Sequence, residues 1–435
     1  MNKKFEALAM GSSTHVAGSR AWLKLLARRA ARFSLEVAVG EDPPVQVLPE
    51  RIATLRLYDH RVALRLLADP DLVFGQAYVD GQLRVDGDLI AVLEAVSRGT
   101  APEGRLPNGH CFGPGFSARV LAQLSRAVSR VAAAIQLDRQ LDRQLDRQGP
   151  DGSENMRHVA AHYDLGNDFF KLWLDPSMTY TCAYWDSPDA SLEQAQHAKR
   201  ELVCHKLRLR SGERVVDAGC GWGSLAIHMA RHHGVRVRAF NISAQQVDWA
   251  RRQVNEQGLG SMVEVVHDDF RNAGGTYDAF ASVGMLEAIS PGDYRELGRT
   301  IDRLLGNQGR GLLHSIGRPR PYPTNAWIDR YIFPGGYTPS LAEILAILEP
   351  SGFVAVDVEN LRQHYVRTLE HWLAAFEASN ALLIAERGGA FVRMWRLYLA
   401  AAIAGFRSGW LQLFQVGFER PAIAGTPRPR REASL

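Results

Sequence analysis

The stretch Asp217-Ala-Gly-Cys-Gly-Trp-Gly223 decides the fold of this chain. It follows a short β-branched run over residues 214–218 and precedes a segment with helical periodicity that begins at Ser224. Glycines at every second position let the backbone turn tightly at the end of a parallel strand and approach a ligand closely. The spacing is GxGxG, not the GxGxxG of dinucleotide-binding folds. The stretch therefore predicts a strand, a tight turn and a helix around a small-molecule site.

Outward from this turn, further apolar runs of strand length alternate with helical segments across residues 151–420. This alternation predicts a doubly wound α/β domain. The expected strands are residues 214–218, 235–240, 263–267, 277–283, 311–316, 354–358 and 411–418.

The first third of the chain has a different pattern. Short alternating runs, broken by turn signals, predict strands, and a helix is expected near residues 89–95. The runs are Ile52, Leu55, Leu57 and Val62, Leu64, Leu66. We therefore expect a small α+β domain over residues 1–97.

Residues 20–33, RAWLKLLARRAARF, place Trp, Leu and Phe on one helical face and basic residues on another. One interpretation is attachment to an anionic membrane surface, since this composition is typical of interfacial helices. The other is an ordinary helix that packs on its own domain and exposes a basic face. Residues 1–35 carry seven basic residues and a single acid, Glu6.

Between and after these domains the sequence changes character. Residues 98–116 are rich in Gly and Pro and predict a linker. Residues 117–148 predict a helix that ends in three copies of QLDR, a spacer supported by ion pairs in preference to a coiled coil. We expect residues 98–150 to connect the domains and residues 421–435 to be disordered.

Composition excludes several classes of protein. A net charge of +4 on 435 residues is too small for a general nucleic-acid binder. No apolar run approaches the roughly 18 residues that span a bilayer, and no secretion signal is evident. The four cysteines form no CxxC pair, so we expect free thiols in the cytoplasm and no metal site.

The strand, GxGxG turn and helix, with Asp217 in place, resemble motif I of the class I S-adenosylmethionine (SAM) methyltransferases. The resemblance implies SAM as cofactor. Many such enzymes end the second strand in an acid that holds the ribose, whereas this chain has Asn241. After the third strand, Asp268 would accept from the adenine amino group; capping of a helix by Asp268 or Asp269 is the alternative.

Several further motifs, in order along the chain, resemble the cyclopropane-fatty-acyl-phospholipid synthase family. They are FGQAYVDGQLRVDGDL (74–89), HYDLGNDFF (162–170), MTYTCAYW (178–185), SVGMLE (282–287), LLHSIG (312–317) and WIDRYIFPGG (327–336). The resemblance implies a seven-stranded, Rossmann-like SAM-methyltransferase domain with helical insertions, beside a small N-terminal α+β domain. It also implies transfer of a methyl group to a cis double bond of an unsaturated phospholipid acyl chain, with proton loss closing a cyclopropane ring.

The family match also implies site residues. Bicarbonate acts as base in the family, and its ligands carry over to Cys182, Glu287, His314, the Ile316 backbone and Tyr365. The SAM contacts carry over to Tyr180, Thr181, Asp217, Gly219, Gly221, Gly223, Asn241, Ile242, Ser243, Gln246 and Asp268. Without the match, Cys182 is a buried thiol, His314 a core histidine and Glu287 a carboxylate at a helix start.

The residue types suit this chemistry. An alkene attacks the methyl group with its π electrons, so no base is needed to activate it. The attack leaves a carbocation, which the faces of aromatic rings stabilise. Candidates are Tyr163, Trp173, Tyr180, Tyr184 and Trp185, for which core packing is the alternative. The apolar insertions 318–338 and 371–407 are expected to line an acyl-chain channel or to thicken the core.

One departure affects the product. The family usually has Phe-Glu-His after the fourth strand, and this chain has Leu286-Glu287-Ala288. Relatives with Glu-Ala are associated with methylene- or methyl-branched fatty acids, which gives a second hypothesis. A small-molecule N-methyltransferase and a non-catalytic lipid-binding protein are weaker alternatives. The expected location is the inner face of the cell membrane, with peripheral attachment, and a homodimer is a further expectation.

Overall fold

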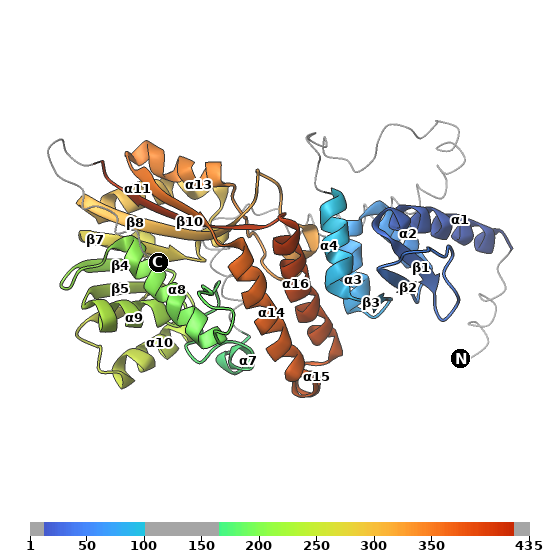
Figure 1. Cartoon of the computed structure of the whole chain (residues 1–435), viewed down its shortest axis with the longest axis horizontal. Helices are drawn as coiled ribbons and strands as arrows, with labels where there is room; N and C mark the ends of the chain where they lie inside the picture. Colours follow the sequence, from blue (N-terminus) through green and yellow to red (C-terminus); the bar gives the residue numbers. More distant parts are fainter. Residues whose placement is uncertain (1–12, 101–164, 422–435) are drawn as a thin grey trace, which may run out of the picture.

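The structure, a computed structural model, describes residues 13–100 and 165–421 (Figure 1). The expected Gly/Pro-rich linker beyond Thr100, the QLDR repeats, Tyr163 and the C-terminal tail beyond Pro421 lie outside the described residues. The described parts form an N-terminal module and a larger α/β domain, which contact each other.

The N-terminal module is α+β, as predicted. Its three-stranded sheet has the order β1-β2-β3, with β1 parallel and β3 antiparallel to β2. Its elements are α1 (Ser13–Ala30), the 3-10 helix η2 (Ala31–Phe33), β1 (Leu35–Val39), β2 (Ala53–Leu57), α2 (Arg61–Ala68), α3 (Pro70–Val79), β3 (Leu83–Gly87) and α4 (Leu89–Thr100).

Two predictions for this module are wrong in detail. The run of Val62, Leu64 and Leu66 is part of helix α2, not a strand, because Val62, Ala63, Leu66 and Leu67 are the buried positions and follow a helical period. Helix α4 continues through residues 98–100, which the sequence assigned to the linker. Gly99 marks close packing there, since a Cβ on it would lie 2.4 Å from the Phe33 ring.

Helix α1 packs on its own domain and exposes a basic face, as the second interpretation of residues 20–33 predicted. Its apolar residues Leu23, Leu26, Ala27 and Ala30 are buried in the core of the module. Lys24, Arg28 and Arg32 are exposed on the other side. The apolar face is therefore used for packing, and only the basic face is open to solvent.

The second domain contains a seven-stranded sheet of order β6-β5-β4-β7-β8-β10-β9. β10 is antiparallel to β8 and β9, and the other pairs are parallel. The strands are β4 (Arg214–Ala218), β5 (Arg236–Asn241), β6 (Val263–His267), β7 (Tyr277–Val283), β8 (Leu305–Gly317), β9 (Val354–Asn360) and β10 (Gln412–Glu419). The predicted fold class is confirmed.

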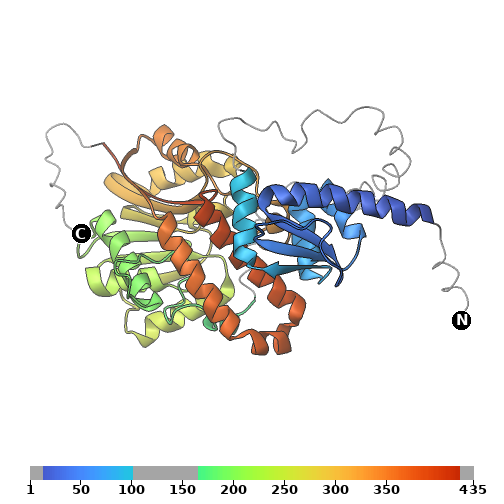
Figure 2. The same cartoon turned by 45° about the vertical axis from the view of Figure 1, so that its right-hand side comes forward.

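Helices cover both faces of this sheet (Figures 1 and 2). They are α8 (Leu192–Leu207), α9 (Ser224–His233), α10 (Ala244–Glu256), α11 (Tyr294–Leu304) and α13 (Leu341–Leu348). Further elements outside this layer are α7 (Asn167–Lys171), α12 (Ala326–Tyr331), α14 (Arg362–Ala378), α15 (Asn380–Arg387) and α16 (Gly389–Ser408). Within the described ranges, no helix is long and apolar enough to cross a membrane.

The two modules meet where α3 and α4 pack against α16 (Figure 1). Helix α3 also contacts α12. Trp327 of α12 is buried against the backbone of α3, where a Cβ on Gly75 would lie 2.4 Å from the indole. Gln76 Nε2 donates to Tyr331 Oη at 2.8 Å, and Arg393 Nε donates to the Val79 carbonyl at 2.8 Å. The insertion around Trp327 is thus held between the two modules.

Candidate active site

The loop after β4 has the backbone geometry that the GxGxG spacing predicted. Gly219, Gly221 and Gly223 have φ angles of 85°, 54° and 86°. A Cβ on Gly219 would lie 2.8 Å from Met285 Cβ, and one on Gly223 would lie 2.9 Å from Ala250 Cβ. Nothing lies within 4 Å of a Cβ on Gly221. Packing thus requires the outer two glycines, and the middle one faces open space.

The end of β5 holds this loop in place. Asn241 Nδ2 donates to the Gly221 carbonyl at 3.0 Å and to Gln246 Oε1 at 2.7 Å. Asn241 Oδ1 accepts from the Ser243 amide at 3.2 Å, and Ser243 caps α10. The predicted cofactor residues Asn241, Ile242, Ser243 and Gln246 therefore lie together, and their side-chain contacts join the loop to α10.

Asp217 lies at the base of the loop in a strongly perturbed environment. It is 1% exposed, and its Oδ2 has no hydrogen-bond partner. Burial raises its pKa to about 7, although attraction to Lys199 opposes this shift. A buried, unpartnered carboxylate oxygen at this place fits a cationic ligand.

Of the two acids after β6, Asp269 is the helix cap. It accepts from the Arg271 amide at 2.9 Å and caps the 3-10 helix η3 (Phe270–Asn272). Asp268 is exposed and accepts from the Asp269 amide and from Asn272 Nδ2. The capping role thus falls to Asp269.

Thr181 contacts Lys199, a residue that the sequence analysis did not identify. Lys199 of α8 is 2% exposed, and its Nζ donates to Thr181 Oγ1 at 2.9 Å. Burial and the nearby Arg200 lower its pKa to about 8, while the carboxyl groups of Asp175 and Asp217 oppose this shift. Gln196, one turn earlier, donates to the Thr181 carbonyl at 2.8 Å. The available signal is the three polar residues Gln196, Lys199 and Arg200 among the buried positions of an otherwise amphipathic helix.

Glu287 lies on the 3-10 helix η4 (Leu286–Ala288) directly after β7. Its Oε1 accepts from the Ile316 amide at 2.6 Å, while its Oε2 is buried without a partner. Burial raises its pKa to about 7, opposed by the hydrogen bond from the Ile316 amide. That amide, expected to donate to an anion, donates to Glu287 instead.

His314 precedes Ile316 by two residues on β8, so both side chains lie on the same face of the strand. Gln415 Nε2 on β10 donates to His314 Nδ1 at 3.0 Å. This bond places the imidazole proton on Nε2, which is buried without a partner. Burial lowers the pKa of His314 to about 3, so the ring is neutral. Gln415, which sequence reasoning also missed, sets this tautomer.

Cys182 and Tyr365 belong to one buried cluster, against which the Ile316 side chain also packs. The Cys182 thiol donates to the Ala183 carbonyl at 3.1 Å, and burial raises its pKa well above the usual range. Cys182 is therefore a neutral thiol. Tyr365 packs against Phe406 and Trp372, with ring centroids 4.7 and 6.0 Å away.

The candidate aromatic residues divide into two groups. Trp173 and Tyr180 join Trp372, with centroid separations of 5.2 to 5.7 Å, and the indole nitrogens of Trp173 and Trp372 have no hydrogen-bond partner. Tyr184 and Trp185 lie apart from this group: Tyr184 stacks on His364, and the Trp185 indole donates to the His364 carbonyl. The first group borders the candidate site, while the second anchors α14.

Comparisons with known proteins agree with this geometry. Residues 151–416 match the family described as mycolic acid cyclopropane synthetase. A probable fatty acid methyltransferase of Pseudomonas putida is 33% identical over 365 residues, covering 81% of this chain and 83% of that protein. The cyclopropane-fatty-acyl-phospholipid synthase of Escherichia coli K12 is 40% identical over 260 residues, which are 60% of this chain and 66% of that enzyme.

Among solved structures, the mycolic acid cyclopropane synthase CmaA1 complexed with SAH and CTAB is 30% identical. Its TM-score is 0.58, and the match covers 61% of this chain and 98% of that one. The relatives thus include both cyclopropane synthases and fatty acid methyltransferases. With the glycine loop, the buried polar atoms of Glu287 and His314 and the family match over most of its length, the chain belongs to the mycolic acid cyclopropane synthetase family.

Proposed function

We propose that this protein is a SAM-dependent methyltransferase that modifies unsaturated phospholipid acyl chains and closes a cyclopropane ring at a cis double bond. The observation that carries the proposal is the pair of buried, unpartnered atoms Glu287 Oε2 and His314 Nε2, which the paired strands β7 and β8 and the bond from the Ile316 amide to Glu287 bring to one end of the sheet. A carboxylate acceptor and a neutral imidazole donor are the groups needed to hold a small oxyacid anion.

The residues present fit SAM. Asp217 would hold a positive charge of the cofactor, and the open space at Gly221 lets it approach the backbone. When bound, SAM supplies an electrophilic methyl group. The chain's task is to align that group with the double bond and to exclude water, and Trp173, Tyr180 and Trp372 stabilise the cation that the substrate becomes.

Bicarbonate fits the remaining two atoms. Glu287 Oε2 would accept its O–H, and His314 Nε2–H would donate to one of its oxygens, so that the anion is oriented to take a proton from the substrate. Gln415 keeps the proton on His314 Nε2. With its amide engaged by Glu287, Ile316 fixes the carboxylate and leaves the donor role to His314.

The second candidate is methylation of the acyl chain without ring closure, giving methylene- or methyl-branched lipids. Ala288 beside Glu287 favours it, because no second imidazole stands at that position. The similarity to a probable fatty acid methyltransferase over 81% of the chain also favours it.

The deciding experiment supplies purified protein with vesicles of a phospholipid that carries one cis double bond and with methyl-deuterated SAM. Mass spectrometry reports the added group, and NMR of the product separates ring methylene from exomethylene and branched methyl signals. Ring signals support the first proposal and branched signals the second. The absence of any labelled lipid contradicts both.

We propose further that the protein binds the membrane peripherally through the basic face of α1. Lys24, Arg28 and Arg32 are exposed at successive turns, and each contributes about 1 kcal/mol near an anionic surface. Because α1 is part of the module core, the test changes charge instead of removing the helix. Sedimentation with phosphatidylglycerol vesicles should fall strongly in the triple Gln variant, and unchanged sedimentation would contradict the proposal. Arg51, Arg61 and Arg65 changed to Gln provide the matched control.

A further inference from the structure

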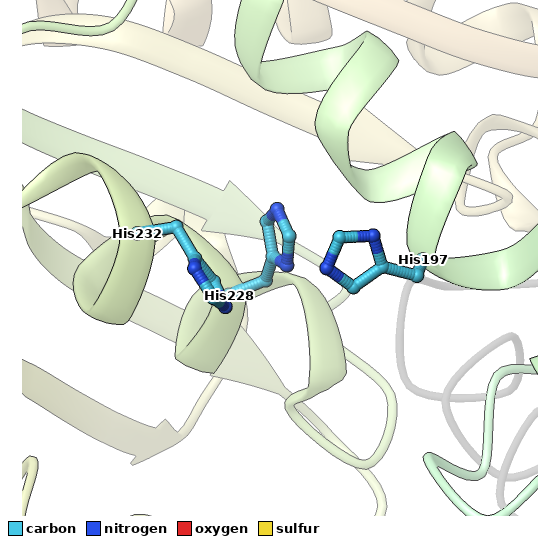
Figure 3. A group of neighbouring side chains, drawn as sticks. All are labelled: His197, His228 and His232. Carbon is cyan, nitrogen blue, oxygen red and sulfur yellow. The ribbon is translucent and has the colours of Figure 1, made fainter. Parts of the chain in front are cut away.

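A group of imidazoles lies on the outer side of the α/β domain, where α8 packs against α9. His228 and His232 are one turn apart on α9, and His197 approaches them from α8 (Figure 3). One ring nitrogen from each of the three lies within 4.8 Å of the other two. Ring centroids are 4.5 Å apart for His228 and His232 and 5.0 Å apart for His197 and His228.

Helical spacing explains this arrangement. Residues four apart on a helix project from the same face, so His228 and His232 both face α8. His228 is 4% exposed and forms the floor of the group, whereas His197 and His232 are exposed. The group is thus fixed at its base and open to solvent at its rim.

A carboxylate orients the buried member. Glu201 Oε2 lies 2.9 Å from His228 Nε2, which leaves His228 Nδ1 for another partner. Metal-binding histidines commonly give their second nitrogen to a carboxylate, which fixes the ring and raises its basicity. Burial lowers the pKa of His228 to about 4, so its lone pair is not protonated at neutral pH. The nearby Arg200 guanidinium donates to the Ser177 and Thr179 hydroxyls.

We propose that His197, His228 and His232 bind one divalent transition-metal ion of the zinc type, with water completing its coordination. Three imidazoles suit zinc, nickel, copper and cobalt. Zinc–nitrogen bonds of about 2.1 Å in a tetrahedral site require the nitrogens to be about 3.4 Å apart. The two exposed rings can close this difference by side-chain rotation alone.

The site does not depend on the proposed function, and it has a structural consequence. The ion joins α8, whose Lys199 and Gln196 hold Thr181, to α9, which begins at the last glycine of the cofactor loop. Metal binding therefore stiffens two supports of that loop from outside the active site.

A second set of ligands overlaps the first. Cys204, His228 and His233 also lie within reach of one another, and Glu201 contacts both histidines. Occupation there would use the buried thiol of Cys204. The two arrangements differ in sulfur ligation, so a spectroscopic measurement distinguishes them.

The test uses the full-length, untagged protein after treatment with a chelator. Calorimetric titration with Zn²⁺ should give one site per chain, and the exposed double variant His197→Gln, His232→Gln should weaken it by about 100-fold or more. His60→Gln is the matched control, because His60 is an exposed histidine of the N-terminal module and contacts neither the group nor Glu201.

Titration with Co²⁺ gives the independent readout. The expected spectrum has visible cobalt bands and lacks the intense near-ultraviolet band of thiolate ligation. The proposal is overturned if the wild-type protein binds no zinc, if the double variant binds it as tightly as wild type, or if a thiolate band appears.

Discussion

The cofactor loop (217–223) lies next to the Glu287–His314 site, by which we mean Glu287, His314 and Gln415, and the two regions are held by different kinds of interaction. The loop takes its shape from the positive φ angles of its own glycines, and Asn241 at the end of β5 bonds to the loop and to Ser243 and Gln246. The Glu287–His314 site brings together residues from η4, β8 and β10 and leaves two buried polar atoms unpartnered. Backbone conformation thus determines the first region. In the second, two polar atoms are buried without hydrogen bonds, which lowers the stability of the fold but keeps reactive groups away from water.

The largest effect should come from a methyl group added where the two regions touch. Gly219→Ala combines a positive φ with a Cβ 2.8 Å from Met285 Cβ, two residues before Glu287. We expect the free energy of unfolding to fall by about 3 kcal/mol and SAM affinity to fall more than tenfold. Gly221→Ala has no such contact and should lose only about 1 kcal/mol of stability. Thermal unfolding and calorimetry measure both; equal stability losses would contradict this account.

Glu287→Gln should next separate chemistry from cofactor binding. Gln can still accept from the Ile316 amide, but it cannot serve as an anionic acceptor through the second oxygen. Turnover should fall by about 10²- to 10⁴-fold, with SAM affinity unchanged. Glu296→Gln, an exposed change on α11, is the control. If Glu287→Gln also weakened SAM binding, Glu287 would contribute to cofactor binding, and its assignment to the chemical step alone would be wrong.

The pH dependence sharpens the same contrast. Because the pKa of Glu287 is raised to about 7, its carboxylate forms only as pH rises through that value, and turnover should rise with it. Between the ordinary carboxylate pKa and about 7, the folded protein retains a proton that the unfolded chain releases. Stability therefore falls as pH rises through this window.

Glu287→Gln should remove the contribution of Glu287 to that slope, leaving that of Asp217, and gain on the order of 1–3 kcal/mol of unfolding free energy at pH 8 relative to wild type. Chemical denaturation at pH 5 and pH 8 measures it. An identical pH slope in both proteins would show that Glu287 keeps an ordinary pKa.

The smallest expected effect comes from Gln415→Met, which removes the donor to His314 Nδ1 without changing volume greatly. Turnover should fall about tenfold, in line with the loss of one buried hydrogen bond. NMR of the His314 ring should show a changed tautomer. Gln412→Met, at the start of the same strand, is the control, and a normal tautomer in Gln415→Met would remove Gln415 from the mechanism.

The contrast also explains what sequence analysis found. β4, β6 and β7 have the predicted bounds, because short apolar runs between turn signals specify them locally. Val62, Leu64 and Leu66 were misassigned because the alternation ignored the buried Ala63 and Leu67. Lys199 and Gln415 escaped because their importance arises from partners 18 and 101 residues away, which no local pattern encodes. The family resemblance identified Glu287 and His314 as candidates. The structure adds that Glu287 Oε2 and His314 Nε2 are buried without a hydrogen-bond partner.

The contact of Trp327 with Gly75 makes the position of the insertion depend on the N-terminal module. The match to the solved relative covers 98% of that chain but only 61% of this one, so this chain has a large part outside the match. Here the insertion that is expected to meet the acyl chain leans on the backbone of the N-terminal module. A chimera that exchanges only one of the two modules should therefore disturb the packing of Trp327 on Gly75, and with it the insertion, even if each module folds.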